Sequence, residues 1–402
     1  MPRKIAVVVQ RYGLEINGGA EYHARLIAEK LSRHFAVEVF TTTAADYVTW
    51  AHHYPAAREE LNGIPVNRYR VVKPRDPEAF GRIQKRIFEE EHVLADELSW
   101  LEAEGPLVPD LLRDLEMREG EFAYFLFFSY RYYHSFHGLK KFGRKAILVP
   151  TAEHDEVIHL ALFRDIFNLP AAIVYNSHEE KELIHRVSGN RDVPGDIVGV
   201  GSEIPDRFDP EGVGARLGID SRYVVYIGRL DENKGVPELF RFYLRLQAEE
   251  KTDVKLVLVG KAHVPVPEHP AIVHVGFQEN REKFDLLAGA EFLVMPSQYE
   301  SLSMVALEAW AVGKPVLANG RTEVLRGQCR RSNAGLWYSD FDEFREAFLA
   351  LSEDRELRLR LGANGRDFFQ ANYSWDVIEN KYLEIISALD KRRQKKPAGR
   401  ST

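Results

Sequence analysis

The most informative nine residues of this chain are Glu300-Ser-Leu-Ser-Met-Val-Ala-Leu-Glu308. It follows a strand-like apolar run at 292–295. The residues from Ser301 to Val312 have a helical composition, which ends at Gly313-Lys-Pro315 before another apolar run. Strand, helix and strand in succession form the repeating unit of a parallel α/β sheet. We therefore predict an α/β fold, with the first glutamate just before a helix and the second two turns inside it.

The two carboxylates of this stretch suit a phosphorylated sugar ligand. At ~1.5 Å rise per residue they lie ~12 Å apart along the helix axis, about the span from the sugar ring to the ribose of a nucleotide sugar. The first helical turn between them offers free N–H groups and the positive end of the helix dipole, which favour a diphosphate. An ordinary amphipathic helix with a chance carboxylate at each end is the alternative interpretation.

A second motif stands upstream and adds positive charge. Tyr223–Ile227 is a predicted buried strand, followed by Arg229 and Lys234 and then by a helix that Pro237 opens. Open α/β sheets bind ligands at the carboxyl ends of their strands, where Arg229 can fork onto phosphate oxygens and Lys234 can add a point charge. Solvated loop charges beside neighbouring acidic residues are the alternative.

Together these motifs resemble the retaining GT-B glycosyltransferases that carry Glu-x7-Glu, relatives of the sucrose and glycogen synthases (glycosyltransferase family 4-like, glycosyl transferases group 1). Markers occur in that family's order along nearly the whole chain: Gly18-Gly19-Ala20-Glu21, Gly228-Arg229…Lys234-Gly235, Val273–Phe277, Pro296-Ser297…Glu300, Glu308–Val316 and Tyr373-Ser-Trp375. The chain has Ser301-Leu302-Ser303 where many relatives have Gly-Phe-Gly. This departure keeps the backbone amides but changes the local fit to a donor.

The resemblance implies two Rossmann-like α/β/α domains facing a cleft, with a C-terminal helix that crosses back to the first domain. We place an acceptor domain at 1–205, joined by the helix 375–390, and a nucleotide-sugar donor domain at 206–374. Gly, Pro and Asp cluster between 201 and 218, where we place the hinge. The basic tail 391–402 is predicted to be disordered, with contact to anionic lipid as a weaker interpretation.

The resemblance also implies roles for the donor-domain residues. Glu308 would hold the ribose hydroxyls and Glu300 the sugar hydroxyls, while the backbone amides of Ser301, Leu302 and Ser303 hold the diphosphate. Arg229 and Lys234 would neutralise the departing diphosphate, where charge develops in the transition state. Phe277 would line the base pocket.

Three first-domain residues join this predicted site. Gly18 and Gly19 would let the backbone approach the phosphates, because no side chain blocks the way. His154 follows an apolar run that ends at Pro150, and the resemblance puts it beside the reacting sugar; a histidine satisfied by its carboxylate neighbours is the alternative. The segment Ser129–His137 mixes aromatic residues with Arg and His, and would form either an acceptor wall or core packing.

Composition bounds the class of protein. The chain has 402 residues, 45% hydrophobic and 29% charged, which is typical of globular domains, and its net charge of −7 argues against a nucleic-acid partner. Cys329 is the only cysteine, which favours a reducing compartment. The apolar run Phe122–Phe128 is far below the ~20 residues that span a bilayer, and the N-terminus runs into a strand at Lys4 with no signal-peptide pattern. We expect a cytoplasmic protein, or one peripheral on the inner face of a membrane.

The predicted function is that of a retaining, hexosyltransferase-like glycosyltransferase (EC 2.4) of polysaccharide biosynthesis. It would move a sugar from a UDP- or GDP-type donor to a glycan, lipid-linked or small-molecule acceptor, with no cofactor. We expect it to be metal-independent, because no Asp-x-Asp pair falls in a loop suited to the donor. A GT-B sugar-nucleotide 2-epimerase, which needs no acceptor, and a non-catalytic sugar-nucleotide binding protein are the alternatives.

Overall fold

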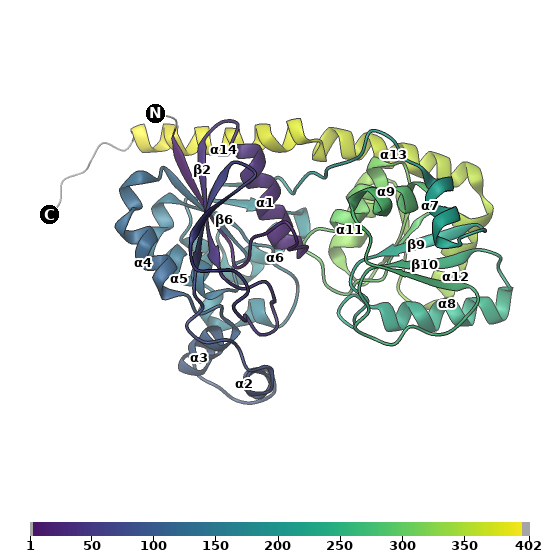
Figure 1. Ribbon diagram of the computed structural model, residues 1–402, viewed down its shortest axis with the longest axis horizontal. Coiled ribbons are helices and arrows are strands. Elements are labelled where there is room, and N and C mark those ends of the chain that lie inside the picture. The colour runs from purple at the N-terminus through teal and green to yellow at the C-terminus, as the bar shows by residue number, and fades with distance from the viewer. Residues whose placement is uncertain (1–2, 396–402) are drawn as a thin grey trace. The chain divides into compact units, whose positions relative to one another are not determined.

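The chain forms two compact units in a computed structural model that describes residues 3–395. The first unit is Met1–Val200 with Ile378–Thr402, and the second is Gly201–Val377. Each unit is built on one sheet, parallel except for a single strand of the first, with helices on both of its faces (Figure 1). The predicted α/β class is confirmed, and the division at Gly201 falls at the start of the segment in which we placed the hinge.

The first unit holds an eight-stranded sheet of order β3-β4-β2-β1-β5-β6-β7-β8. Its strands are β1 Lys4–Val8, β2 Ala36–Thr42, β3 Arg58–Leu61, β4 Ile64–Tyr69, β5 Tyr124–Phe128, β6 Ala146–Val149, β7 Ala172–Tyr175 and β8 Gly195–Ile197. Its helices are α1 Gly19–Leu31, α2 Pro77–Glu89, α3 Leu94–Glu104, α4 Pro109–Met117, α5 Tyr133–Phe142, α6 His178–Ser188 and most of α14, Trp375–Lys395.

One edge of this sheet is a hairpin that the sequence analysis missed. β3 runs antiparallel to β4, and the two residues that join them, Asn62 and Gly63, both have positive φ (51° and 77°). An Asn-Gly pair between two strands is the sequence signal of such a turn, because its backbone twist matches that of the flanking strands.

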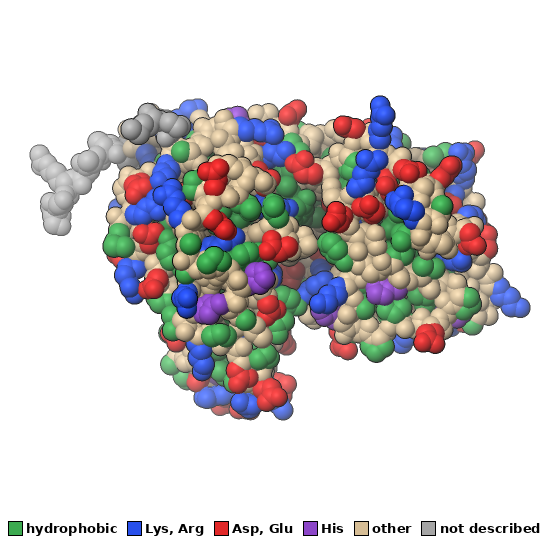
Figure 2. Space-filling model, in the orientation of Figure 1, with side chains coloured by type: hydrophobic (Ala, Val, Ile, Leu, Met, Phe, Trp, Pro, Cys, Tyr) green, Lys and Arg blue, Asp and Glu red, His purple; other side chains and the backbone are tan. Residues whose placement is uncertain are grey.

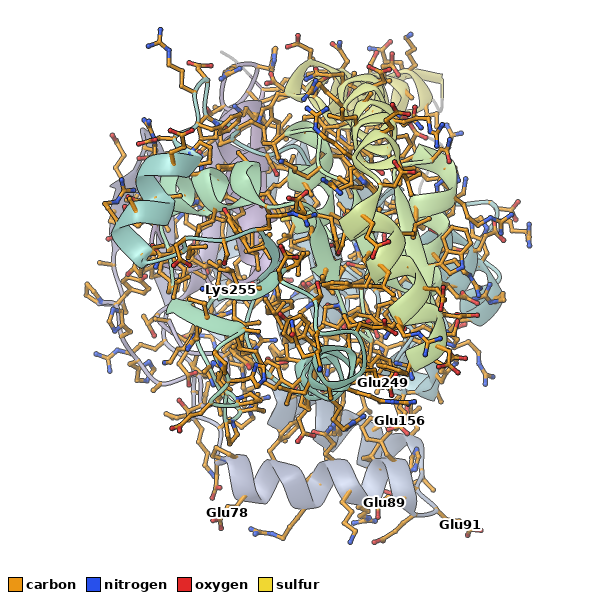
Figure 3. The ribbon with its side chains drawn as sticks, turned by 90° about the vertical axis from the view of Figure 1, so that its right-hand side faces the viewer. Glu78, Glu89, Glu91, Glu156, Glu249 and Lys255 are labelled. Carbon is orange, nitrogen blue, oxygen red and sulfur yellow. The ribbon has the colours of Figure 1, made fainter. Side chains whose placement is uncertain are left out.

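Aromatic packing covers one face of the first sheet. The apolar strand β5 sends Phe125 and Phe127 against α5, where the rings of Phe125 and Phe142 stack with centroids 4.7 Å apart. In Figure 1 α4 and α5 lie on this side of the sheet and α1 lies on the other. Helix α2 is mostly exposed, and Figure 3 labels Glu78 and Glu89 near its two ends.

The second unit holds a six-stranded parallel sheet of order β11-β10-β9-β12-β13-β14. Its strands are β9 Tyr223–Ile227, β10 Lys255–Val259, β11 Ile272–Gly276, β12 Leu293–Met295, β13 Val316–Asn319 and β14 Gly335–Tyr338. Its helices are α7 Pro210–Leu217, α8 Val236–Glu250, α9 Asn280–Gly289, α10 Met304–Ala311, α11 Glu323–Ser332, α12 Phe341–Glu353 and α13 Arg355–Tyr373.

Two details of the prediction are corrected. Helix α10 begins at Met304 rather than Ser301, so Glu308 lies a little over one turn inside it, not two. The chain is helical through Lys395, so the first part of the predicted disordered tail belongs to α14, while the rest of that tail lies outside the described residues. The start of α10 and the end of α14 differ from their predicted positions, because composition marks a helix boundary less sharply than its cap does.

Acidic and basic side chains are interspersed over the visible surface, without a large area of one sign (Figure 2). Among the helices within residues 3–395, none is both long and apolar enough to cross a membrane.

Helices α10 and α13 approach each other through glycines. A methyl group added at Gly362 would overlap the carbonyl oxygen of Gly313, and one added at Gly365 would lie 2.6 Å from a ring carbon of Trp310. We expect Gly362→Ala to destabilise the protein by about 1–3 kcal/mol, because a backbone oxygen cannot move aside as a side chain can.

The matched control is Gly81→Ala in the exposed helix α2, where an added methyl group meets nothing within 4 Å. That substitution should be neutral or stabilise by about 0.5–1 kcal/mol. Scanning calorimetry of both variants checks the pair, and an unchanged melting temperature for Gly362→Ala would contradict the close packing.

Candidate functional site

The strand order of the second unit reverses at β9, which lies between β10 and β12. β9 and β12 pair in parallel, with Leu293 opposite Val225, so their carboxyl ends meet at one edge of the sheet. In open α/β sheets the crevice outside such a reversal is where ligands bind. The two motifs of the sequence analysis follow these two strands, so the topology brings them together.

The loops after β9 and β12 pack backbone against backbone. Gly235 has φ 69°, and a side chain there would overlap the carbonyl oxygen of Pro296. The Gln298 N–H also donates to the Asn233 carbonyl at 3.4 Å. Gly235 therefore serves both a left-handed conformation and a close approach, which fixes one loop on the other.

Lys234 and Glu300 form an ion pair across these loops. The Lys234 Nζ donates to Glu300 Oε1 at 2.8 Å, and the two side chains are 27% and 9% exposed. The Lys234 backbone N–H donates to Asp231 Oδ1 at 2.9 Å, which holds the start of the loop. The predicted cation and the predicted sugar-binding carboxylate thus lie within hydrogen-bond distance of each other.

Arg229 is the more exposed of the two predicted cations. Its Nη2 lies 3.3 Å from Asp231 Oδ2, and 42% of its side chain is exposed. The Tyr226 hydroxyl donates to the Arg229 carbonyl at 2.6 Å, and burial raises the pKa of Tyr226 well above its ordinary value. The Arg229 backbone is held in place while its guanidinium faces solvent.

The start of α10 lies just after Glu300. The Ser303 Oγ accepts the Ala306 N–H at 3.3 Å, so Ser303 is the N-cap residue. Ser301 is partly exposed, whereas Leu302 and Ser303 are 8% and 2% exposed. The side chain of Leu302 is therefore packed inside, and only its backbone could meet a ligand. The positive end of the helix dipole lies at this cap.

Glu308 is buried in α10 and has one paired and one unpaired oxygen. Its side chain is 3% exposed, and its Oε1 accepts Lys283 Nζ at 2.7 Å. Its Oε2 has no hydrogen-bond partner within the described chain. Lys283, on α9, was missed by the sequence analysis, because no strand end or motif marks it.

The region predicted to bind the nucleotide base lies at the carboxyl ends of β10 and β11. Phe277 follows β11 and is 61% exposed, while the His274 ring nitrogen Nε2 lies 2.8 Å from the Gly260 carbonyl oxygen. Gly260 has φ 141°, and a side chain there would overlap the Gly228 carbonyl oxygen. The role of Phe277 in binding a base stays a prediction.

In the first unit, Gly18 and Gly19 begin α1 beside a buried ion pair. Arg11 Nε donates to Glu21 Oε1 at 2.7 Å, and the two side chains are 11% and 6% exposed. A side chain at Gly18 would overlap the Glu21 carboxylate, whereas one at Gly19 would meet nothing within 4 Å. Gly18 thus has a structural reason to be glycine, and the approach of Gly18 and Gly19 to phosphates stays a prediction.

His154 is exposed and lies in a loop that contacts of the neighbouring residues Ala152 and Asp155 hold in place. The loop leaves β6 through Thr151 (φ 48°), the Ala152 N–H donates to the buried Glu180 Oε1 at 2.6 Å, and Arg131 Nη1 lies 3.3 Å from Asp155 Oδ2. Burial raises the pKa of the Glu180 carboxyl to about 8. The His154 ring is 5.7 Å from that of His159, and its predicted role beside a sugar stays a prediction.

The aromatic segment 129–137 contributes mainly to the core. Tyr130 and Phe136 are 2% and 1% exposed and belong to the main apolar cluster of the first unit. His134 is fully buried, which lowers the pKa of its imidazole to about 3. Core packing therefore accounts for these three residues, while Arg131 and Tyr132 remain partly exposed.

One Asp-x-Asp sequence of the second unit is part of a helix cap. Asp340-Phe341-Asp342 stands at the start of α12, where Asp340 Oδ1 accepts the Glu343 N–H at 2.9 Å as a helix cap. Across residues 3–395, no three His, Cys, Asp or Glu side chains gather as a metal site would require.

Comparison with solved structures identifies the fold class. Sucrose-phosphate synthase from Thermosynechococcus elongatus superposes with a TM-score of 0.71 at 17% identity, covering 97% of this chain and 100% of that one. HepE of Anabaena, in complex with UDP and glucose, superposes with a TM-score of 0.69 at 16% identity, covering 96% of this chain and 100% of that one. The chain has the GT-B fold, as predicted.

Comparison of sequences adds the family. Residues 215–368 match the family model described as Glycosyl transferases group 1, so the second unit carries a domain of that family. The predicted resemblance to group 1 glycosyltransferases is confirmed, whereas the retaining mechanism and the roles of the Glu-x7-Glu residues stay predictions. The MMP alpha-(1->4)-mannosyltransferase of Mycolicibacterium hassiacum is 34% identical over 38% of this chain and 39% of its own length. The lipopolysaccharide core biosynthesis glycosyltransferase LpsE of Rhizobium meliloti is 28% identical over 42% of this chain and 51% of its own length. The chain thus spans about half or less of these curated relatives.

The Arg11–Glu21 pair generates a stability prediction. Arg11→Met leaves the Glu21 carboxylate buried without its cation, which should cost about 3–5 kcal/mol. Arg113→Met is the control in the same unit, because the Arg113–Asp110 pair is 66% and 63% exposed and its loss should cost under about 1 kcal/mol. Urea unfolding of both variants measures the difference, and equal midpoints would refute the role of the buried pair.

Proposed function

We propose that this protein is a retaining glycosyltransferase that transfers a hexosyl group from a nucleoside-diphosphate sugar to an acceptor. The observation that carries the proposal is the meeting of Lys234 and Glu300, 2.8 Å apart, at the strand reversal of a glycosyl transferases group 1 domain. The names of the curated relatives support transfer rather than epimerisation or simple binding, because each of those cited above is a glycosyltransferase.

The diphosphate is the leaving group in this chemistry, so negative charge grows on it as the glycosidic bond breaks. Lys234 pairs with Glu300 just before α10, whose dipole also favours an anion, and Arg229 lies five residues earlier on the same loop as Lys234. A preorganised set of donors aimed at developing charge is the strongest catalytic contribution that a site of this kind can make. The proposal assigns the departing diphosphate to these two cations and to the amides of residues 301–303.

The two glutamates have different tasks in the proposal. Glu300 accepts hydroxyl groups of the transferred sugar, and its ion pair with Lys234 keeps both side chains at the reacting end of the donor. Glu308 accepts ribose hydroxyls through Oε2, which has no hydrogen-bond partner among residues 3–395. Gly18, Gly19 and His154 are assigned to the same reaction from the first unit, and Phe277 to the base.

The donor is proposed to be of UDP or GDP type, which the UDP bound in the HepE structure supports for the fold. The acceptor is proposed to be a glycan or a lipid-linked sugar, in line with the lipopolysaccharide core named for LpsE. Action in the cytoplasm, with or without contact to the inner face of a membrane, is part of the same proposal. Mixing the protein with nucleotide sugars and candidate acceptors, and following nucleoside diphosphate release, tests it.

We expect catalysis to need no divalent metal. Arg229 and Lys234 supply the positive charge that a metal would otherwise bring, and Asp340 is engaged in capping α12. Donor turnover should therefore survive an excess of EDTA. Complete loss of activity that Mn²⁺ restores would overturn this part of the proposal.

Substitutions should separate ground-state binding from turnover. Ribose contacts change little during the reaction, so Glu308→Gln should raise the KM for donor more than it lowers kcat. Arg229→Ala and Lys234→Ala remove charge stabilisation worth ~3 kcal/mol and should lower kcat roughly a hundredfold. Steady-state kinetics with varied donor provide the measurement.

Circular dichroism and melting curves that match the unmodified protein serve as the folding control for all three variants. If Arg229→Ala and Lys234→Ala keep a near-normal kcat while folded, the assignment of the diphosphate to these cations is wrong.

A further inference from the structure

The buried pair Lys283–Glu308 joins two helices of the second unit. Lys283 lies on α9 and Glu308 on α10, and their Nζ and Oε1 atoms are 2.7 Å apart. Both side chains are shielded, at 17% and 3% exposure. A pair this shielded is not a surface ion pair, whose contribution to stability would be small.

The pair provides a hydrogen-bond donor for one of the two oxygens of the Glu308 carboxylate. Oε1 accepts the lysine, while Oε2 is buried and has no hydrogen-bond partner in the part of the chain that the structure describes. A buried acceptor without a donor is unfavourable, and native proteins rarely leave one unless a ligand or water completes it. A donor from outside the chain, either a ligand hydroxyl or N–H or a water molecule, would complete this oxygen.

Lys283 is itself held, so it can fix the carboxylate. Its Nζ lies 4.6 Å from the centroid of the neighbouring Phe284 ring, and Phe284 is fully buried. The next residue, Asp285, accepts the Asp209 N–H at 2.7 Å, which ties this helix to the segment before α7. With its ammonium on one oxygen, Lys283 sets the plane of the carboxylate and hence the direction in which Oε2 faces.

We propose that Lys283 is a positioning residue that orients Glu308 so that Oε2 accepts a ribose hydroxyl, giving the site its preference for ribonucleotides over deoxyribonucleotides. The proposal rests on the donor site described under the proposed function and adds a residue and a selectivity to it. A carboxylate oxygen that meets a ligand hydroxyl makes a charge-assisted bond, and a ligand without that hydroxyl leaves the buried oxygen unpaired.

The test compares ligands that differ by one hydroxyl group. UDP and GDP are titrated calorimetrically into the full chain, beside the 2′-deoxy and 3′-deoxy forms of whichever binds. The unmodified protein should bind the ribonucleotide at least about tenfold more tightly than one of the deoxy forms. Lys283→Met should bind the ribonucleotide about tenfold more weakly, with little change for that deoxy form, so that the preference is lost.

Two variants control the test. Lys283→Arg keeps a cation on Oε1 and should retain most of the preference. Lys255→Met removes another lysine–carboxylate pair of the second unit, in which Lys255 Nζ lies 2.9 Å from Asp220 Oδ1. Lys255 is the first residue of β10, at the opposite end of that strand from the site (Figure 3 labels Lys255). It should leave binding unchanged.

The outcomes separate this inference from the proposed function. If neither UDP nor GDP binds the unmodified protein, the proposed donor site fails. If one of them binds and Lys283→Met, folded by circular dichroism, keeps the preference, the positioning role is wrong. If Lys283→Met does not fold, loss of the preference in Lys283→Arg would overturn the inference and its retention would support it.

Discussion

The parallel pairing of β9 with β12 is the constraint on which the candidate site depends. These strands are distant in the sequence, yet their pairing places Leu293 opposite Val225 and brings the two following loops together. Gly235 then allows one loop to lie against the carbonyl of Pro296, where a side chain would not fit. This backbone contact places Lys234 of the first loop beside Glu300 of the second, where the two side chains form an ion pair.

Charge in this site is arranged as two buried or half-buried pairs. Lys234 with Glu300 and Lys283 with Glu308 each join elements that are separate in the sequence. Pairing offsets the desolvation that a single buried charge would suffer. The two pairs differ in two respects. Within residues 3–395 Glu308 Oε2 has no hydrogen-bond partner, and Lys234 is the more exposed of the two lysines. We infer that the first pair serves the reacting end of a donor and the second its ribose.

The sequence predicted strands β9 and β12, but neither β3 nor β14. Buried parallel strands such as β9 read as continuous apolar runs, and the motif residues stand directly after them, so both could be located without coordinates. The start of α10 was placed too early, because Ser303 rather than Ser301 provides the cap. The hairpin of β3 and β4 was missed even though Asn62-Gly63 signals it.

The rest of the site could not be read from the sequence. Lys283 looks like any helix-surface lysine until the fold places it 2.7 Å from Glu308, and the Arg11–Glu21 pair depends on how the loop before α1 turns back. Glu21 is one of the family markers in the sequence, but the markers do not indicate Arg11 as its ion-pair partner. Such contacts depend on the packing of elements against one another, which periodicity and local motifs do not encode.

We infer that the second unit binds the diphosphate of a nucleotide through Arg229, Lys234 and the start of α10. Isothermal titration of the full chain with UDP, GDP and ADP, each beside its monophosphate, tests it most directly. We predict that at least one diphosphate binds with one site per chain and at least about tenfold more tightly than its monophosphate. If no diphosphate binds, or if mono- and diphosphates bind equally, the account of this site is contradicted.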